Sequence, residues 1–324
     1  MQANTRQIIL KSRPDGPVKG ENFETREVGL PDPEDGDVLV RVIYMSLDPY
    51  MRGRMDAAKS YAANFEVGEP MIARSVGEVV VSRNNAYHAG DLVVGMMDWS
   101  DYAVVPGAKG LKTADPEFAP LPYYLGALGM PGMTAWIGMT EIGKPKEGET
   151  LFVSAASGAV GQVAGQMGRM AGCRVVGCAG SDEKVAYLTG EIGFDAAFNH
   201  RTEGDYLGAL KRCCPTGIDV NFENVGGAML EAVIEHANDY ARSIQCGAIS
   251  QYNLVEDKRY GIKNLEHIHR KRIHMEGFIV TDHWKRLDEF IAEMGSWLKL
   301  GTMTYKIDIT EGLENAPAAF MAML

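Results

Sequence analysis

The sequence has no surplus of positive charge and no long apolar run. It holds 32 Lys and Arg residues against 43 Asp and Glu residues, a formal net charge of -11. Because nucleic-acid phosphates need a basic surface, we expect no nucleic acid as a partner. No apolar run approaches the ~20 residues that span a bilayer, so we expect no membrane partner. The first residues, Met1–Gln7, lack the apolar core of a signal peptide, which favours a cytoplasmic location.

Cysteine is also scarce, and it is unevenly distributed. The chain has five cysteines, an odd number, and all of them lie between Cys173 and Cys246. In a large acidic chain this usage is typical of reduced thiols rather than of disulfides. We therefore expect free cysteines, in agreement with a cytoplasmic location.

The most informative stretch that is present is Leu151–Gly161. An apolar run leads into small residues, Gly158 and Gly161 then open a helical pattern, and a second apolar strand follows at Arg174–Cys178. This order predicts a βαβ unit whose first turn and helix N-terminus can hold a pyrophosphate. The usual G-x-G-x-x-G pattern lacks its first glycine, and a bare G-x-x-G is also common in structural turns. The strand–turn–helix context favours a dinucleotide site.

The end of the second predicted strand indicates which dinucleotide binds. NAD enzymes usually carry Asp or Glu there, which accepts a hydrogen bond from the ribose 2′-OH. Here Gly180 and Ser181 occupy that place, while Asp182 and Glu183 fit the first turn of the next helix, where carboxylates are favoured. Lys184 is either a solvated helix lysine or a ligand of a 2′-phosphate. The pattern favours NADP(H).

The pattern of the chain changes near residue 125, and its length suits two domains. The part before that point is β-rich, with predicted strands over residues 38–45, 77–82, 91–95 and 102–105. From Leu128 onward helices and strands alternate, which is typical of an α/β fold with a doubly wound parallel sheet. Its predicted strands cover residues 151–154, 174–178, 196–199, 218–223, 242–249 and 273–280. A helix over 284–300 and a strand over 305–309 follow.

These patterns predict three parts. Residues 1–125 form a β-rich substrate domain, residues 126–285 a dinucleotide-binding domain, and residues 286–324 a return to the substrate domain. In open α/β sheets ligands bind beyond the carboxyl ends of the strands. We expect the active site there.

Several motifs resemble one family along nearly the whole chain. They are Leu47–Met55, Leu128–Ala135, Ala155–Gly161, Ala179–Lys184, Phe222–Gly227, Cys246–Asn253 and Glu276–Phe278. The chain resembles the zinc-independent double-bond reductases of the medium-chain dehydrogenase/reductase superfamily, the group that includes prostaglandin and curcumin reductases. The resemblance implies a Rossmann domain, a GroES-like substrate domain and a homodimer.

The resemblance also implies the residues that bind the cofactor. They are Gly158, Ala159, Val160, Gly161, Lys184, His200, Asn224, Cys246, Gly247, Ala248, Ile249, Ser250, Tyr252, Phe278, Ile279 and Val280. Among them the glycine turn would hold the pyrophosphate, Lys184 the 2′-phosphate, and Phe278–Val280 would flank the nicotinamide. His200 stands where the family has a second 2′-phosphate ligand, a tyrosine. A tyrosine proposed near the family's nicotinamide aligns with Arg270 and is not carried over.

A zinc alcohol dehydrogenase is the nearest alternative in this superfamily. A catalytic zinc needs about three side-chain ligands of suitable type. Ser46–Pro49 stands where the ligand cysteine would lie, and the β-rich part contains no cysteine. His267 and His269 are two residues apart, a spacing that does not place both rings on one helix face. We expect no metal.

Without a metal, reduction of a conjugated C=C bond is the chemistry most compatible with these residues. Hydride adds to the β-carbon of an α,β-unsaturated ketone or aldehyde, and a hydrogen-bond donor stabilises the enolate that results. Tyr50 is the first candidate for that donor and Tyr252 the second, although most tyrosines are core rings with a bonded hydroxyl. Arg52 and Arg54 either attract an anionic substrate or pair with Asp48 or Asp56. The alternatives are a quinone reductase and a protein that binds NADPH without turnover.

Overall fold

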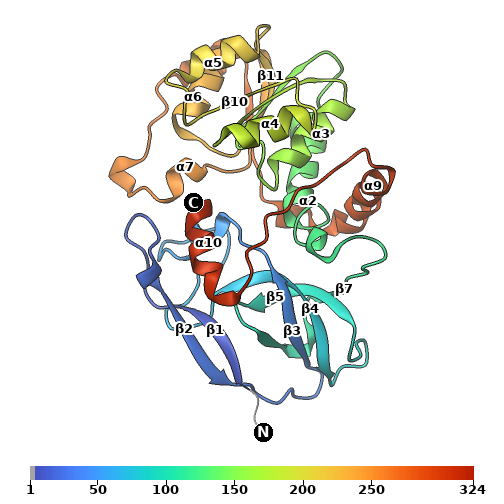
Figure 1. The fold of residues 1–324 in the computed structure, drawn as a ribbon. Coiled ribbons are helices and arrows are strands. Elements are labelled where there is room, and N and C mark those ends of the chain that lie inside the picture. Colours follow the sequence, from blue (N-terminus) through green and yellow to red (C-terminus); the bar gives the residue numbers. More distant parts are fainter. Residues whose placement is uncertain (1–3) are drawn as a thin grey trace. The chain divides into compact units, whose positions relative to one another are not determined.

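The computed structural model describes residues 4–324, which form two units (Figure 1). Unit 1 comprises the described residues up to Leu125 together with Tyr252–Val255 and Ile307–Leu324. Unit 2 comprises Gly126–Gln251 and Glu256–Lys306. Over residues 4–324, no helix combines the length and the apolar character that crossing a membrane requires.

Unit 1 is built on antiparallel strands. A five-stranded sheet has the order β6-β3-β4-β5-β7, and β1 pairs with β2 separately. The strands are β1 Asn4–Leu10, β2 Phe23–Gly29, β3 Val38–Met45, β4 Ile72–Ser82, β5 Leu92–Asp98, β6 Tyr102–Val105 and β7 Lys112–Thr113. The helices are α1 Tyr50–Arg54 and α10 Ala316–Met323, with short 3-10 helices at Gly20–Asn22, Pro106–Ala108, Leu121–Tyr124 and Leu313–Asn315.

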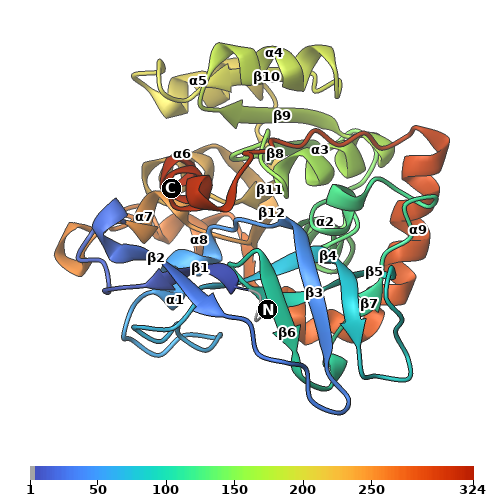
Figure 2. The same cartoon turned by 60° about the horizontal axis from the view of Figure 1, so that its bottom comes forward.

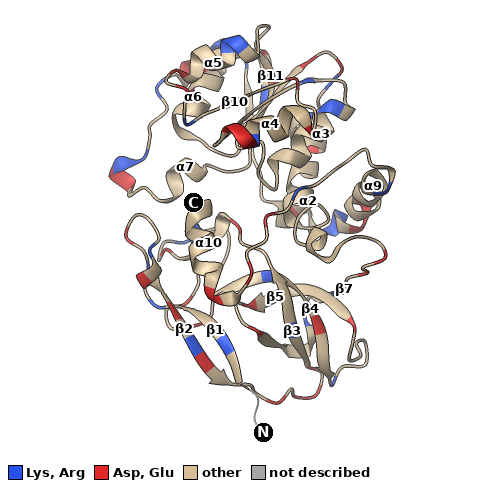
Figure 3. Cartoon of the chain, viewed as in Figure 1, with Lys and Arg blue, Asp and Glu red and all other residues tan. Residues whose placement is uncertain are grey.

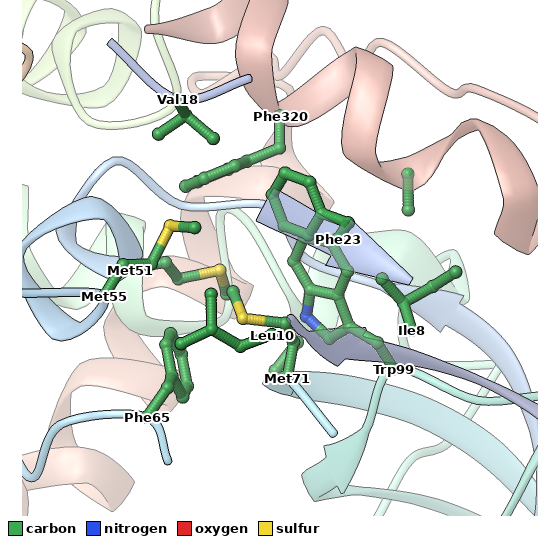
Figure 4. Packing of buried hydrophobic residues seen from close by; sticks show 12 residues of the cluster. Ile8, Leu10, Val18, Phe23, Met51, Met55, Phe65, Met71, Trp99 and Phe320 are labelled. Carbon is green, nitrogen blue, oxygen red and sulfur yellow. The ribbon is translucent and has the colours of Figure 1, made fainter. Parts of the chain in front are cut away.

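One apolar cluster of unit 1 joins distant parts of the sequence. Figure 4 shows Met51 of α1 and Met55, which follows the helix, packed with Phe65, Trp99 and Phe320. The Trp99 and Phe320 rings meet edge to face at 5.9 Å, a favoured arrangement for aromatic rings. Since Met51 of α1 and the adjoining Met55 are both buried here, the cluster fixes the helix that carries Tyr50.

Unit 2 is built on a six-stranded parallel sheet in the order β10-β9-β8-β11-β12-β13 (Figure 2). The strands are β8 Thr150–Val153, β9 Arg174–Ala179, β10 Ala196–Asn199, β11 Ile218–Glu223, β12 Ala237–Gln245 and β13 His274–Gly277. Numbered within the unit, this order is 3-2-1-4-5-6, the order of doubly wound dinucleotide-binding sheets. The order reverses between β8 and β11. The predicted Rossmann-type fold with a separate β-rich unit is confirmed.

Most helices of unit 2 connect successive strands, whereas the first α-helix precedes β8 and the last follows β13. The α-helices are α2 Met130–Ile137, α3 Gly161–Met170, α4 Asp182–Gly190, α5 Tyr206–Cys213, α6 Gly227–His236, α7 Ile249–Tyr252, α8 Glu266–Arg270 and α9 Leu287–Leu300, with a π-helical turn at Gly138–Gly143 and 3-10 helices at Glu256–Lys258 and Val280–Arg286. The last residue of α7, Tyr252, already belongs to unit 1.

The structure corrects several predicted elements. The strand expected over 242–249 is β12, which ends at Gln245, and the strand expected over 273–280 ends at Gly277. The helix expected over 284–300 begins only at Leu287. The prediction of a strand over 305–309 is wrong. Its backbone bonds to a side chain of α3 and not to another strand, because the Lys306 N–H donates to Gln162 Oε1 at 2.9 Å. The sequence analysis also missed β1 and β2.

Candidate cofactor and active site

The turn after β8 has the close geometry that its small residues predict. Ala155 adopts a left-handed conformation with φ of 48°, and the Gly158 N–H donates to its carbonyl oxygen at 3.0 Å. Helix α3 then begins at Gly161. A Cβ on Gly161 would lie 2.5 Å from the Ala155 carbonyl oxygen and 2.7 Å from the Cα of Ala156. Only glycine fits, so the N-terminus of α3 stays open to a ligand.

A buried carboxylate lies at the end of β11. Glu223 is fully buried, and its Oε1 accepts hydrogen bonds from Ser154 Oγ at 2.9 Å and from the N–H groups of Val225 and Gly226 at 2.7 and 2.8 Å. Its Oε2 accepts from Asn221 Nδ2 at 3.3 Å. A buried charge is tolerated where hydrogen bonds satisfy it. Glu223 therefore ties the turn after β8 to the turn after β11.

Backbone bonds bring the end of β12 to the same place. The N–H groups of Cys246 and Gly247 both donate to the Glu223 carbonyl oxygen at 3.0 Å, and the Ile249 N–H donates to the Asn224 carbonyl oxygen at 3.0 Å. The side chain of Asn224 donates in turn to the Ser154 carbonyl oxygen at 2.7 Å. The structure thus joins, at the carboxyl ends of β8, β11 and β12, three of the segments predicted to hold the cofactor.

His200 and Arg201, which follow β10, lie beside the end of β9, where NAD enzymes carry a carboxylate. A Cβ on Gly180 would lie 3.3 Å from both His200 Nε2 and Arg201 Nε. Burial, and then the charge of Arg201, lower the pKa of His200, so its ring is neutral at pH 7. Arg201 was missed in the sequence analysis, although it follows His200 directly and shares its turn.

The first turn of α4 is acidic, as Figure 3 shows, yet it carries the predicted lysine. Ser181 caps this helix, because its Oγ accepts from the Lys184 N–H at 3.3 Å. The Asp182 carboxylate accepts from Asn199 Nδ2 at 2.8 Å. Lys184 is exposed in that turn. The Asp182 carboxylate thus accepts a hydrogen bond within the protein near the end of β9, while the exposed Lys184 can contact an anion.

The predicted nicotinamide residues follow β13, the edge strand beside β12. Gly277 pairs with Gln245 of β12, so Phe278–Val280 leave the sheet at the same carboxyl edge. Val280 is buried, whereas Phe278 and Ile279 are half-buried. They therefore lie at the carboxyl edge of the sheet, and their role at the nicotinamide stays a prediction.

Tyr50, the first predicted donor, is half-buried on α1. Burial, and then the neighbouring Asp48, raise the pKa of its phenol, although Arg54 and Arg74 act in the opposite direction. The hydroxyl therefore keeps its proton at neutral pH. Asp48 is buried and accepts from Ser46 Oγ at 2.8 Å, and burial raises its pKa to about 6.

The remaining residues with side chains capable of chemistry are found in different surroundings. Tyr252, the second predicted donor, groups with unit 1 by its contacts, like Tyr50. Tyr260, in contrast, donates its hydroxyl to Glu231 at 2.9 Å. Arg52 forms the predicted ion pair with Asp56 at 2.6 Å. Burial raises the pKa of Cys246 to about 12, which does not suit a nucleophile.

The side chains of residues 4–324 offer no cluster of three or more His, Cys, Asp or Glu able to hold a metal ion. His267 pairs with Glu235 at 2.9 Å, and His274 with Glu276 at 2.8 Å. All five cysteines are free.

Comparisons with known proteins cover both units. A family model described as the N-terminal domain of oxidoreductase matches residues 6–113, and one described as zinc-binding dehydrogenase matches residues 159–296. The chain is 44% identical to 2-alkenal reductase (NADP(+)-dependent) of Nicotiana tabacum, over 99% of this chain and 94% of that protein. It is 43% identical to NADPH-dependent curcumin reductase of Escherichia coli, over 98% of this chain and 93% of that protein.

A solved structure agrees with these relatives. The crystal structure of CurA in complex with NADPH from Vibrio vulnificus has a TM-score of 0.92 and 42% sequence identity, over 98% of this chain and 95% of that one. Such identity over nearly the whole of each chain is strong evidence of common descent. The chain belongs to the medium-chain dehydrogenase/reductase family.

Proposed function

We propose that this chain is an NADPH-dependent reductase of the C=C bond in α,β-unsaturated ketones or aldehydes. The observation that carries the proposal is the near full-length identity to a 2-alkenal reductase and a curcumin reductase, at 44% and 43%. The glycine turn and the carboxylate-free end of β9 support the same conclusion from the residues.

The residues present fit NADPH, which when bound supplies the hydride. The backbone of Gly158–Gly161 holds the pyrophosphate, because Gly161 keeps the N-terminus of α3 accessible. Lys184 and His200 hold the 2′-phosphate, and we add Arg201 to them on the strength of its position beside Gly180. Asn224 and Cys246–Ser250 complete the site on the β11 and β12 side. Phe278, Ile279 and Val280 form its nicotinamide end.

The tyrosines of unit 1 act on the substrate. Hydride addition to the β-carbon leaves negative charge on the substrate oxygen, and a protonated phenol can stabilise it by hydrogen bonding. The raised pKa of Tyr50 keeps its hydroxyl in the donor form, and this supports Tyr50 as that group. Tyr252 is the second candidate, and it also serves the cofactor site. Solvent or a tyrosine then protonates the α-carbon.

The reaction proceeds without zinc in this proposal. The residues at Ser46–Pro49 offer one carboxylate and no thiol or imidazole, which is not a zinc ligand set. An enolate also needs less stabilisation than the alkoxide of carbonyl reduction. Residues 1–125 supply the substrate side, residues 126–285 the cofactor side, and residues 286–324 return to the former. The homodimer and the cytoplasmic location stay predictions from the sequence.

An absorbance assay of NADPH consumption tests the function. The substrates are a 2-alkenal, a cyclic enone, a saturated aldehyde and a quinone, each repeated with NADH. We expect turnover of the first two alone, with NADPH strongly preferred. Turnover of the saturated aldehyde would instead indicate a carbonyl reductase, and quinone activity alone a quinone reductase. NADPH binding without any turnover would indicate a binding protein.

A further inference from the structure

Arg52 is a buried arginine that holds three segments of unit 1. Its side chain is only 5% exposed. The guanidinium donates to Asp56 Oδ1 at 2.6 Å, to the Gly16 carbonyl oxygen at 2.8 Å and, through Nε, to Asn253 Oδ1 at 3.2 Å. A planar guanidinium can make three such bonds in fixed directions, which a lysine ammonium cannot. Arg52 is therefore committed to structure and cannot serve as a free anion receptor.

The bond to Asn253 connects residues 201 positions apart in the sequence. Asn253 lies in Tyr252–Val255, the four residues that belong to unit 1 while the chain on both sides belongs to unit 2. The segment is half-buried, and the Asn253 backbone lies against Gly16: a Cβ on Gly16 would be 3.7 Å from the Asn253 carbonyl oxygen. Arg52 and the Gly16 loop thus fix the residue that directly follows Tyr252.

The segment is also the start of a longer loop, Leu254–Asn264. At the far end of that loop the Lys263 N–H donates to Glu231 Oε2 at 2.7 Å and Asn264 Nδ2 donates to the Glu231 carbonyl oxygen at 2.9 Å. Between these ends, Glu256–Arg259 is exposed. Within the loop, Tyr260 donates its N–H to Gln251 Oε1 at 2.7 Å and its hydroxyl to Glu231 Oε1 at 2.9 Å. The second half of the loop is therefore held at Tyr260 and at Lys263–Asn264, whereas Asn253 supplies a side-chain anchor at its start.

Arg54, the second arginine of α1, holds another loop of unit 1. Arg54 donates to the Ala63 carbonyl oxygen at 2.7 Å, and its guanidinium lies 4.1 Å from the centre of the Phe65 ring. It holds the loop of residues 57–69. Helix α1 thus carries Tyr50 together with one arginine for each of two loops.

We propose that Arg52, acting through Asn253, is a positioning residue that fixes Tyr252 and the start of the Leu254–Asn264 loop for binding of the enone substrate. This inference rests on the proposed function for its kinetic part. Loss of the bond loosens the segment and weakens enone binding, while the cofactor turn after β8, which the bond does not touch, keeps its geometry.

Variants of Asn253 test the inference better than variants of Arg52. Arg52→Met would leave Asp56 and the Gly16 carbonyl without their partner and would destabilise unit 1 as a whole. Asn253→Ala removes only the acceptor of the third bond. Asn253→Asp keeps the Oδ1 acceptor and serves as the conservative rescue. Asn4→Ala, which removes a bond from Asn4 Nδ2 to Glu27 in the same unit, is the matched control.

Two readouts are measured on the full chain. Limited trypsin digestion follows cleavage after the exposed Lys258 and Arg259, which reports loop opening independently of any activity. Steady-state kinetics with a 2-alkenal separate the KM of the enone from the KM of NADPH. For Asn253→Ala we expect about tenfold faster cleavage and an enone KM raised about fivefold. The NADPH KM should rise less than the enone KM, because the turn after β8 keeps its geometry. Asn253→Asp and Asn4→Ala should behave like the unaltered chain.

The outcomes separate this inference from the proposed function. If Asn253→Ala is cleaved at the unaltered rate and keeps its enone KM, the inference is wrong. It is also wrong if Asn253→Asp is impaired as strongly as Asn253→Ala, because the Oδ1 acceptor would then not be the determinant. If the unaltered chain reduces no enone, the proposed function fails, and the digestion alone decides whether Asn253 anchors the loop.

Discussion

The cofactor end of unit 2 and the α1 region of unit 1 are built in different ways. In unit 2, backbone groups and one buried carboxylate, Glu223, join the turns after β8, β11 and β12, and a glycine makes the closest approach. In unit 1, single side chains such as Arg52 and Arg54 hold separate loops around Tyr50. The first region suits one invariant ligand, since little in it can change. The second can be altered one side chain at a time, because each arginine holds its own loop.

The largest effect should come from filling the glycine turn. Gly161→Ala places a Cβ 2.5 Å from the Ala155 carbonyl oxygen, so the turn must shift and the N-terminus of α3 with it. We expect NADPH affinity to fall more than a thousandfold, about 4 kcal/mol. Gly190→Ala in α4, where no atom lies within 4 Å of the new Cβ, is the control and should bind NADPH normally. Calorimetric titration measures both, and equal affinities would contradict the steric account.

Removal of the buried Glu223 carboxylate should weaken the bonds that join the turns after β8, β11 and β12. Glu223→Ala leaves the N–H groups of Val225 and Gly226 without an acceptor, and the Ser154 hydroxyl keeps only the Phe222 carbonyl oxygen at 3.4 Å. Because unsatisfied buried donors are costly, we expect about 4 kcal/mol less stability to urea, together with weaker NADPH binding. Glu223→Gln keeps one acceptor oxygen and should lose less. A Glu223→Ala chain of unaltered stability would show that the three turns do not depend on this residue.

In the α1 region the buried carboxylate is Asp48, and it should make the free energy of unfolding depend on pH. Burial raises the pKa of Asp48 to about 6, so the folded chain holds this proton to a higher pH than the unfolded chain, whose value is near 3.8. The free energy of unfolding should therefore fall by about 2 kcal/mol between pH 4 and pH 6 on account of this group. Asp48→Asn keeps an acceptor for Ser46 and should remove that part of the slope in urea unfolding. An unchanged slope would mean that Asp48 titrates normally.

The smallest effect should come from the exposed cations at the end of β9. Lys184→Ala and Arg201→Ala each remove one of the ligands that we propose for the 2′-phosphate. We expect each to raise the NADPH KM about tenfold while the NADH KM stays the same. Arg212→Ala, which loses an exposed pair with Glu203 in the same unit, is the control. If Arg201→Ala raises the two KM values equally, Arg201 does not read the 2′-phosphate.

The two regions also differ in how far the sequence predicts them. The turn after β8 follows from local signals, because the strand, the small residues and the helix are adjacent along the chain. The same holds for β3 and β10, whose bounds were predicted residue by residue. The bond between Arg52 and Asn253 joins residues 201 positions apart, and no local pattern indicates it. The strand expected at 305–309 failed for a related reason. The backbone N–H and carbonyl of Lys306 bond to the side chain of Gln162, a residue 144 positions away, and not to a neighbouring strand.

Hydride transfer to the β-carbon of an enone is the central claim, and a labelled cofactor tests it most directly. The chain is incubated with NADPH carrying deuterium at the transferable position and with a cyclic enone, and the product is examined by mass spectrometry and NMR. The account predicts a saturated ketone with one deuterium on the β-carbon, formed equally well in the presence of a metal chelator. An allylic alcohol with deuterium on the carbinol carbon, or activity that the chelator abolishes, would contradict it.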